Sequence, residues 1–250
     1  MDESWPEISF EAKAVLPALK SFEADAAPGP SGLKAEHLRD CCTCSSSGTC
    51  ESLTKALARF AHALLNGQFP ETFGEFLLSG TLLPFKKPDG GVRPIVVGEV
   101  LRQLTAKLAM AQLKSSIPKV LLPLQCGVAV KDAVSMVAHT LRLSVRAAAI
   151  DQKLGALQID ISNAFNEVSR SAILSFVVEH FPLLARWTRW SLCQRGKLVN
   201  GETTIWSERG VQQGDPLAPM LFACGIQRIL LRLRERHPSL LSLWYWTMVI

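Results

Sequence analysis

An acidic residue lies between two isoleucines in the segment Leu157-Gln158-Ile159-Asp160-Ile161. The apolar residues predict a short, mostly buried strand over 157–161. A carboxylate on a buried strand is costly to desolvate unless it is paired or binds a cation. Capping of the helix that follows is the alternative explanation, because Asp, Ser and Asn all favour that position. Asp160 is therefore a candidate cation ligand or a helix cap.

Three basic residues, Lys86, Lys87 and Arg93, border a turn rich in Pro and Gly. The turn joins two segments, 81–85 and 92–97, whose composition predicts an antiparallel hairpin. Lys offers a mobile point charge and Arg a rigid fork of donors, so the two types together can hold a polyphosphate. A solvated basic turn with no ligand is the alternative.

A glycine-bearing segment, Gly210-Val211-Gln212-Gln213-Gly214-Asp215-Pro216, precedes a predicted helix. Such a turn can lay its main chain close to a ligand, with the N–H groups of the helix facing that ligand. An ordinary junction between a loop and a helix is the alternative. Taken alone, the segment does not decide between the two.

The elements that must position these residues are mostly helical. Apolar spacing predicts helices at 10–24, from 34 onward, and at 51–65, 100–113, 132–149, 171–181, 184–194 and 217–234. A second hairpin is predicted from 197–199 and 203–206, which flank the turn pair Asn200-Gly201. Because strands come in isolated pairs among many helices, the sequence predicts an α+β fold.

In this order and spacing, the segments resemble those of reverse transcriptases, particularly those of non-LTR retrotransposons. Residues 27–33 look like the family's N-terminal Pro-Gly-Pro-Asp-Gly element, with Ser31 in place of the usual Asp. Residues 86–95 are similar to the fingers hairpin, and residues 160–165 look like the first palm carboxylate motif. Residues 213–216 match the Gln-Gly-x-Pro element. The resemblance covers roughly residues 10–245.

The resemblance implies a right-hand polymerase, with fingers and a partial palm, helix-rich with short antiparallel strands and with the thumb absent. The palm strand that ends at Asp160 is expected near the Asn200-Gly201 hairpin. The expected divisions are an N-terminal extension with a Cys/Ser-rich loop at 1–50, a fingers-like region at 51–150, a partial palm at 151–245 and an out-of-frame tail at 246–250.

The resemblance also implies a metal site. Asp160 would bind two Mg²⁺ ions in a two-metal nucleotidyl transfer, and the main-chain carbonyl of Ile161 would be a further oxygen ligand. In the family, the other acids come from a Tyr-x-Asp-Asp hairpin. Residues 243–250 occupy that place here and contain no acid, which argues against binding of both ions by this chain.

Substrate contacts are implied for five residues. Lys86 and Arg93 would hold the β- and γ-phosphates and neutralise the charge that builds on them. Phe165 would stand under the sugar and exclude a 2′-OH, so that deoxynucleotides are selected. Gln213 would contact the incoming nucleotide, with Gly214 allowing close approach. The implied partners are an RNA template, a DNA primer and deoxynucleoside triphosphates.

The genetic code suggests why the acids are missing. Residues 246–249, Trp-Thr-Met-Val, must be encoded TGG-ACN-ATG-GTN. One nucleotide restored before Trp246 would give, after Tyr245, a Leu, Val or Met, then Asp, then Asp, Asn, His or Tyr, then Gly. We therefore expect residues 246–250 to be read out of frame and this chain to be inactive in synthesis. An unrelated C-terminal tail is the alternative.

Charge is unevenly distributed along the chain. The net charge is +5, and residues 81–150 hold ten Lys and Arg against three Asp and Glu. A basic middle third suggests a phosphate-rich partner, with a solvated basic face as the alternative.

Two further functional hypotheses stand beside DNA synthesis. The chain is either a non-catalytic nucleic-acid-binding remnant or the product of a pseudogene without function.

Composition bounds the remaining possibilities. A chain of 250 residues with 48% apolar and 20% charged residues is expected to fold, which excludes disorder of the whole. No apolar run approaches the ~20 residues of a membrane span, and the acidic start does not resemble a secretory signal. An intracellular protein with no membrane partner is expected. The cluster Cys41, Cys42, Cys44 and Cys50 departs from the spacing of zinc sites and predicts free thiols in a Ser-rich loop.

Overall fold

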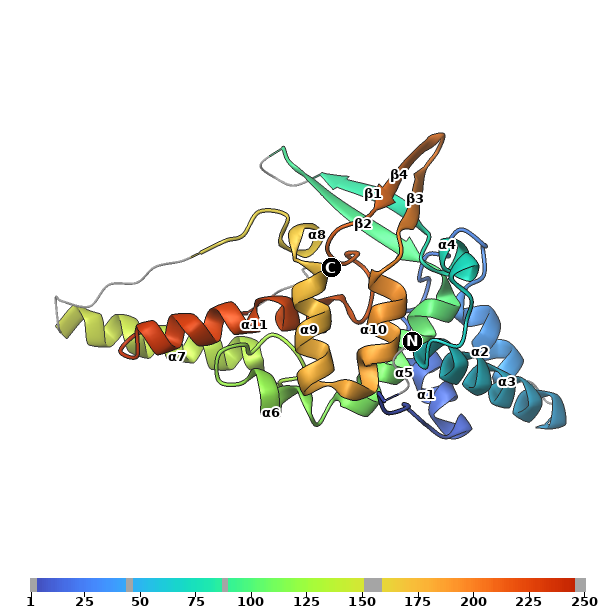
Figure 1. Ribbon diagram of the computed structural model, residues 1–250, viewed down its shortest axis with the longest axis horizontal. Coiled ribbons are helices and arrows are strands. Elements are labelled where there is room, and N and C mark those ends of the chain that lie inside the picture. The colour runs from blue at the N-terminus through green and yellow to red at the C-terminus, as the bar shows by residue number, and fades with distance from the viewer. Residues whose placement is uncertain (1–3, 44–46, 87–89, 151–158, 246–250) are drawn as a thin grey trace.

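The computed structural model describes residues 4–43, 47–86, 90–150 and 159–245. Helices dominate and the strands form one small sheet (Figure 1), so the predicted α+β class is confirmed. The helices are α1 (Val15–Lys20), α2 (Ala35–Thr43), α3 (Ser47–Leu65), α4 (Gly74–Leu77), α5 (Val100–Leu113), α6 (Ile117–Leu121), α7 (Ala133–Ile150), α8 (Ala164–Glu167), α9 (Arg170–His180), α10 (Ala185–Leu192) and α11 (Ala218–Arg236), with 3₁₀ turns at Ala12–Ala14, Glu71–Phe73 and Pro182–Leu184. None of the described helices is long and apolar enough to cross a membrane.

The sheet joins the two predicted hairpins. Strands β1 (Gly80–Lys86) and β2 (Val92–Gly98) pair antiparallel, as do β3 (Gly196–Asn200) and β4 (Thr203–Ser207). The strand order is β2-β1-β3-β4, with β1 and β3 parallel at Gly80 and Leu198. Both antiparallel hairpins are therefore confirmed, and a parallel pairing that was not predicted makes them one sheet.

A first core lies between the N-terminal helices and α5. Its buried side chains come from α1, α2, α3 and α5, and they include Val15, Leu19, Leu57, Ala61 and Leu104. Helix α1 contacts α2, α3 and α5, and α3 contacts α2 and α5. Residues 15–42, which belong to the expected N-terminal extension, thus pack into the same core as helices of the expected fingers-like region.

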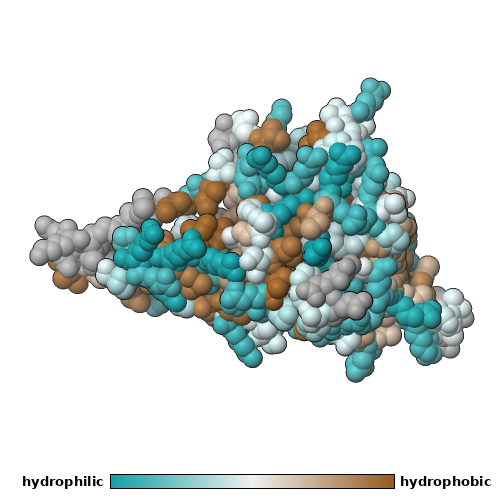
Figure 2. All heavy atoms as spheres, viewed as in Figure 1, coloured by the Kyte–Doolittle hydropathy of each residue, from teal (hydrophilic) through white to brown (hydrophobic). Residues whose placement is uncertain are grey.

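A second core is built mainly by α9, α10 and α11. Phe176, Trp187 and Phe222 are among its buried residues, and α9 lies directly against α11. The opposite face of α5 contributes Ala106 and Ala109, so α5 connects the two cores. Hydrophilic residues cover the outward side of α11 (Figure 2).

The predicted palm strand is wrong over the residues that the structure describes. Residues 159–161 have no strand structure, and Ile159 and Ile161 are 55% and 40% exposed; residues 157 and 158 lie outside the described residues. An apolar alternation becomes a strand only where another strand pairs with it. The 200–201 hairpin pairs with β1 instead of lying beside a strand that ends at Asp160.

The cysteine cluster also differs from its prediction as a loop. Cys41 and Cys42 lie in the last turn of α2, and Cys50 lies in the first turns of α3. Cys41 and Cys42 are free thiols, and Cys42 packs in the first core. Cys44 lies outside the described residues. The Ser-rich composition suggested a loop, but amphipathic helices extend further into this region from both sides.

Candidate functional site

The loop at 212–216 lies along the free edge of β2. The main-chain N–H of Val96 in β2 donates to the carbonyl oxygen of Gln213 over 2.7 Å. Directly before the loop, the N–H of Val211 donates to the carbonyl oxygen of Phe165 in α8 over 2.8 Å. Main-chain hydrogen bonds therefore bring together the basic hairpin, the segment after Asp160 and the glycine-bearing loop.

Gly214 makes the close approach between this loop and β2. Its φ is +109°, and a Cβ at this position would lie 2.4 Å from the carbonyl oxygen of Val96. A side chain is excluded both by the backbone conformation and by the contact. The close approach predicted for Gly214 is thus made to a strand of the protein, and its contact with a nucleotide stays a prediction.

Lys86 and Arg93 are both exposed, but they lie on opposite faces of the hairpin. Lys86 is paired with Val92, and Arg93 is paired with Phe85. Because successive residues of a strand point to opposite faces, this register separates the two cations. The structure does not bring them together at these strand positions, and their shared contact with one triphosphate stays a prediction.

A cavity of about 340 Å³ lies between the two hairpins, α8 and residues 207–212. Leu82 and Pro94 line its hairpin side, and Asn166, Trp206 and Arg209 line the opposite sides. Strand alternation puts Lys86 on the same face of the hairpin as Leu82. The volume of the cavity is within the range of small-molecule sites. The cavity is therefore the candidate place for a nucleotide-sized ligand.

Asp160 lies outside this assembly of contacts. It is exposed in a segment without helix or strand structure, and the structure records no hydrogen bond or ion pair for it among the described residues. Ile161 is exposed beside it. The next residues, Asn163 and Ala164, begin the turn into α8, in which Asn163 has a left-handed φ of 50°.

The described residues do not fit a two-metal site. Hard divalent cations need clustered oxygen ligands, and no group of three or more His, Cys, Asp or Glu residues converges in 4–43, 47–86, 90–150 and 159–245. Asp215 is the nearest acid in sequence to the loop glycine, but its carboxylate is paired with Arg102. A single exposed carboxylate at Asp160, even with the carbonyl of Ile161, supplies too few oxygen ligands to hold two ions.

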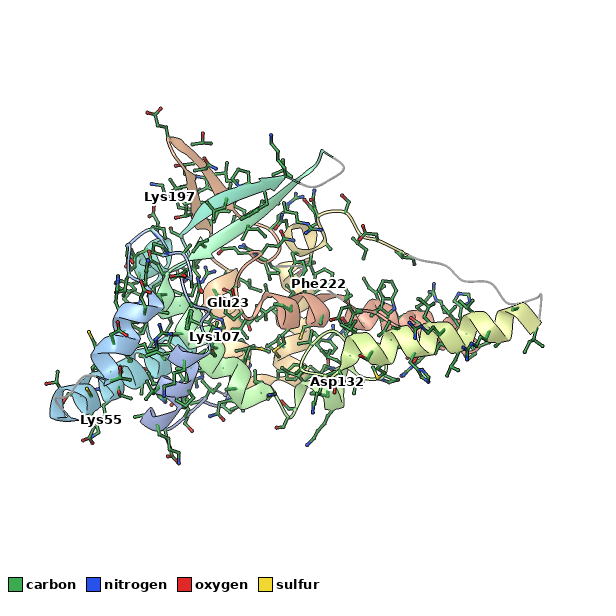
Figure 3. The ribbon with its side chains drawn as sticks, turned by 180° about the vertical axis from the view of Figure 1, so that it is seen from behind. Glu23, Lys55, Lys107, Asp132, Lys197 and Phe222 are labelled. Carbon is green, nitrogen blue, oxygen red and sulfur yellow. The ribbon has the colours of Figure 1, made fainter. Side chains whose placement is uncertain are left out.

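Phe165 and Gln213 occupy different environments. Phe165 is 7% exposed and stacks on Phe222 of α11, with ring centroids 5.0 Å apart; Phe222 lies centrally in the fold (Figure 3). The contact of Phe165 with a sugar stays a prediction, because the ring of Phe165 is packed in the second core. The side-chain oxygen of Gln213 is buried without a hydrogen-bond partner among the described residues.

Arg102 of α5 is a site residue that sequence reasoning missed. It is 2% exposed, and its Nη2 lies 2.9 Å from a carboxylate oxygen of Asp215. The same nitrogen donates to Oε1 of Gln212 over 2.7 Å, and Nη1 donates to the carbonyl of Leu78 over 3.3 Å. The available signal was a charged residue in a mostly apolar helix, but α5 contains both Arg102 and Lys107, and a sequence does not show which helix face is buried.

Arg170, the first residue of α9, was also missed. Its Nε donates to the carbonyl of Gly210 over 2.9 Å, Nη1 to that of Gln194 over 2.7 Å and Nη2 to that of Ser207 over 2.9 Å. Burial lowers the pKa of this guanidinium, although an arginine stays protonated in proteins. Arg170 therefore ties the end of β4 and the start of the loop to α9.

Taken together, the two hairpins, the loop along β2 and the helices behind them form one α+β unit with a candidate substrate face. Residues 85–246 match the family model described as reverse transcriptase (RNA-dependent DNA polymerase). Because this match spans more than half of the chain, the protein belongs to the reverse transcriptase family. The family resemblance that the sequence motifs indicated is thereby confirmed.

A curated relative supports the same assignment. Over 200 residues the chain is 26% identical to the retrotransposable element SLACS 132 kDa protein of Trypanosoma brucei gambiense. The match covers 75% of this chain and 16% of that protein. The chain thus spans well under a fifth of the length of the curated relative that it matches.

Proposed function

We propose that this chain forms the fingers and partial palm of a retrotransposon reverse transcriptase, and that it holds an RNA template, a DNA primer and a deoxynucleoside triphosphate. The observation that carries the proposal is the main-chain bond between Val96 and Gln213. It joins the loop at 212–216 directly to the basic hairpin, so the two proposed recognition elements lie side by side. The name of the curated relative supports the retrotransposon origin.

The nucleotide is proposed to bind in the cavity beside this loop. Val96 and Gln212 line this cavity, and the main-chain hydrogen bond between Val96 and Gln213 holds Gln213 next to it. Lys86, on the cavity face of the hairpin, would supply a positive charge for phosphate oxygens. Arg93, on the opposite face, would contact the template or primer backbone.

We further propose that this chain does not complete the catalytic site. Asp160 belongs to no cluster of three or more His, Cys, Asp or Glu residues in the part of the chain that the structure describes, and residues 237–250 contain no Asp or Glu. The family match ends at Trp246, the first residue that the restored reading frame would replace. Lost or misread coding for the second and third acids would leave binding intact while removing synthesis.

A second candidate function is nucleic-acid binding without catalysis. The excess of basic residues over 81–150 favours it, and both Lys86 and Arg93 are exposed. Such binding depends on phosphate contacts and weakens steeply as salt rises. The two candidates differ in one respect, because a nucleotide site adds selectivity for the dNTP that matches the template.

The test uses the 250-residue chain with a labelled RNA template and DNA primer. Anisotropy in Mg²⁺ buffer is expected to show binding that a matched dNTP strengthens and a mismatched dNTP does not. Primer extension with the same components is expected to be absent. Lys13→Ala removes an exposed lysine far along the sequence from the site. This variant measures how much the loss of any one positive charge changes binding.

Each result has a defined meaning. Binding without any dNTP selectivity would favour the non-catalytic candidate. No binding at low salt would overturn both candidates. Extension that disappears in Asp160→Ala would contradict the proposed inactivity, whereas template–primer binding is expected to be the same in Asp160→Ala as in the unaltered chain.

A further inference from the structure

We propose that Arg102 and Asp215 act as a positioning pair that holds Gln213 and Gly214 in the geometry required for nucleotide contact. This inference rests on the proposed nucleotide role of Gln213. It assigns a purpose to the third residue of the Gln-Gly-x-Pro element, which here is Asp. The contacts of Arg102 also connect the loop to α5, a helix more than one hundred residues earlier in the chain.

The pair is buried and anchored on several sides. The side chain of Arg102 is 3% exposed and that of Asp215 is 14% exposed. The other carboxylate oxygen of Asp215 accepts the N–H of Leu217 over 2.8 Å. Arg102 and Gln212 both donate to the carbonyl of Leu78, over 3.3 and 2.9 Å. The contacts form a closed network among α4, α5 and the start of α11.

The network brackets the two residues of interest. Arg102 binds Gln212 on one side and Asp215 on the other, and Gln213 and Gly214 are the residues between them. A guanidinium is planar and directs its donors in fixed directions, so it sets the separation of the two anchors. The bond from Val96 then sets the orientation of the Gln213 peptide.

Energetics favour a positioning role over a purely stabilising one. Desolvation offsets much of the attraction within a buried ion pair, and apolar or neutral replacements of both partners often cost little stability. Removal of one partner leaves an unpaired buried charge and is far more costly. A variant that removes both charges at once therefore distinguishes the positioning role of the pair from a role in stabilising the fold.

The experiment compares Arg102→Lys and the double variant Arg102→Met/Asp215→Asn with the unaltered chain. Lysine keeps the charge but lacks the fork. The double variant leaves no unpaired charge, and Asn keeps an oxygen for the N–H of Leu217. Glu179→Gln, which breaks the exposed pair with Arg228, is the matched control. The measurements are thermal melting, amide hydrogen exchange at Val96 and the effect of a matched dNTP on template–primer affinity.

Both test variants are expected to melt cooperatively while the Val96 amide exchanges at least about tenfold faster, as expected for losing a charge-assisted contact. The strengthening by matched dNTP should disappear, with template–primer affinity alone changed less than about twofold. The control should match the unaltered chain. If one of the two test variants does not fold, the hydrogen-exchange rate of Val96 in the other variant tests the positioning role.

Unchanged Val96 exchange in a folded variant would overturn the positioning role. An equal acceleration across the amides of α9 and α11 would overturn it too, because that pattern indicates a general loss of stability. If the unaltered chain shows no dNTP effect, the proposed nucleotide contact fails. The exchange measurement still tests the pair in that case, so the two failures are distinguishable.

Discussion

The hydroxyl of Ser31 donates to one carboxylate oxygen of Glu99 over 2.6 Å, and its main-chain N–H donates to the other over 2.9 Å. Glu99 is 3% exposed and stands between β2 and α5. The N-terminal Pro-Gly-Pro-Ser-Gly element is therefore fastened to the end of the basic hairpin. Ser31 stands where the family's usual residue is Asp, and here its hydroxyl and N–H donate to a buried acid, Glu99.

The first prediction concerns this contact. Ser31→Asp is expected to destabilise the chain by about 1–3 kcal/mol, because a second carboxylate would replace a donor to buried Glu99. Adding Glu99→Gln should recover most of that loss, since an amide can donate to the new acid. Urea unfolding of the single and double variants measures the effect. Equal stability of the two variants would contradict the proposed like-charge conflict.

The second prediction separates two effects of a glycine. Gly214→Ala should cost more stability than Gly201→Ala. Both positions have positive φ, which costs an alanine about 1–2 kcal/mol, but a Cβ at Gly201 meets nothing within 4 Å whereas one at Gly214 meets the Val96 carbonyl at 2.4 Å. Thermal melting compares them. Equal losses would mean that the loop moves away from β2 at little cost.

The third prediction is a pH dependence. Burial raises the pKa of the Cys224 thiol, so the folded chain keeps this proton while the unfolded chain releases it above about pH 8.5. The free energy of unfolding should therefore fall as pH rises, by up to about 1.4 kcal/mol per pH unit. Cys224→Ala should show a shallower fall between pH 8.5 and 10.

Thiol labelling provides the control for that experiment. At pH 8, the exposed Cys41 and Cys193 should react with a thiol reagent in the folded chain, while Cys224 should react after denaturation. Identical pH slopes for the unaltered chain and Cys224→Ala would show that burial does not hold the proton. Rapid labelling of Cys224 in the folded chain would point to the same conclusion.

The fourth prediction tests the reading frame. Insertion of one nucleotide before the Trp246 codon places Asp two residues after Tyr245, and where the next codon also encodes Asp, the repaired frame, continued through the downstream coding sequence, should restore Mg²⁺-dependent primer extension. Asp160→Ala in the repaired protein should then lower extension by more than about 10²–10³-fold, the loss typical of a single electrostatic stabiliser. Genomic codons that place neither Asp-Asp nor its near variants in the alternative frame would refute the idea.

Local signals predicted most of the elements but not their assembly. The turn at Asn200-Gly201 and the basic turn after Lys86 predicted two hairpins, because hairpin formation depends on adjacent residues. The parallel pairing between Gly80 and Leu198 joins them over a long separation. No local pattern encodes that partner, and the same limitation explains why the expected strand at Asp160 is wrong.

Site residues divide along a similar line. Gln213 and Gly214 were predicted because their residue types occur together in a recognisable motif, although their role in nucleotide contact stays a prediction. Arg102 and Arg170 were missed because a helix pattern shows which residues are apolar, not which charged residue points inward. Their burial depends on the packing of α5 and α9 against distant loops.

The parallel pairing of β1 with β3 has a consequence for how the chain folds. Asn200 donates to the carbonyl of Leu82, a residue 118 positions earlier. During synthesis the β1–β2 hairpin emerges long before its partner, so one edge of β1 has no strand to pair with until β3 appears. Closing so long a loop is slow, and an open edge invites pairing with other chains. We expect nascent chains that end before Gly196 to aggregate unless a chaperone shields that edge.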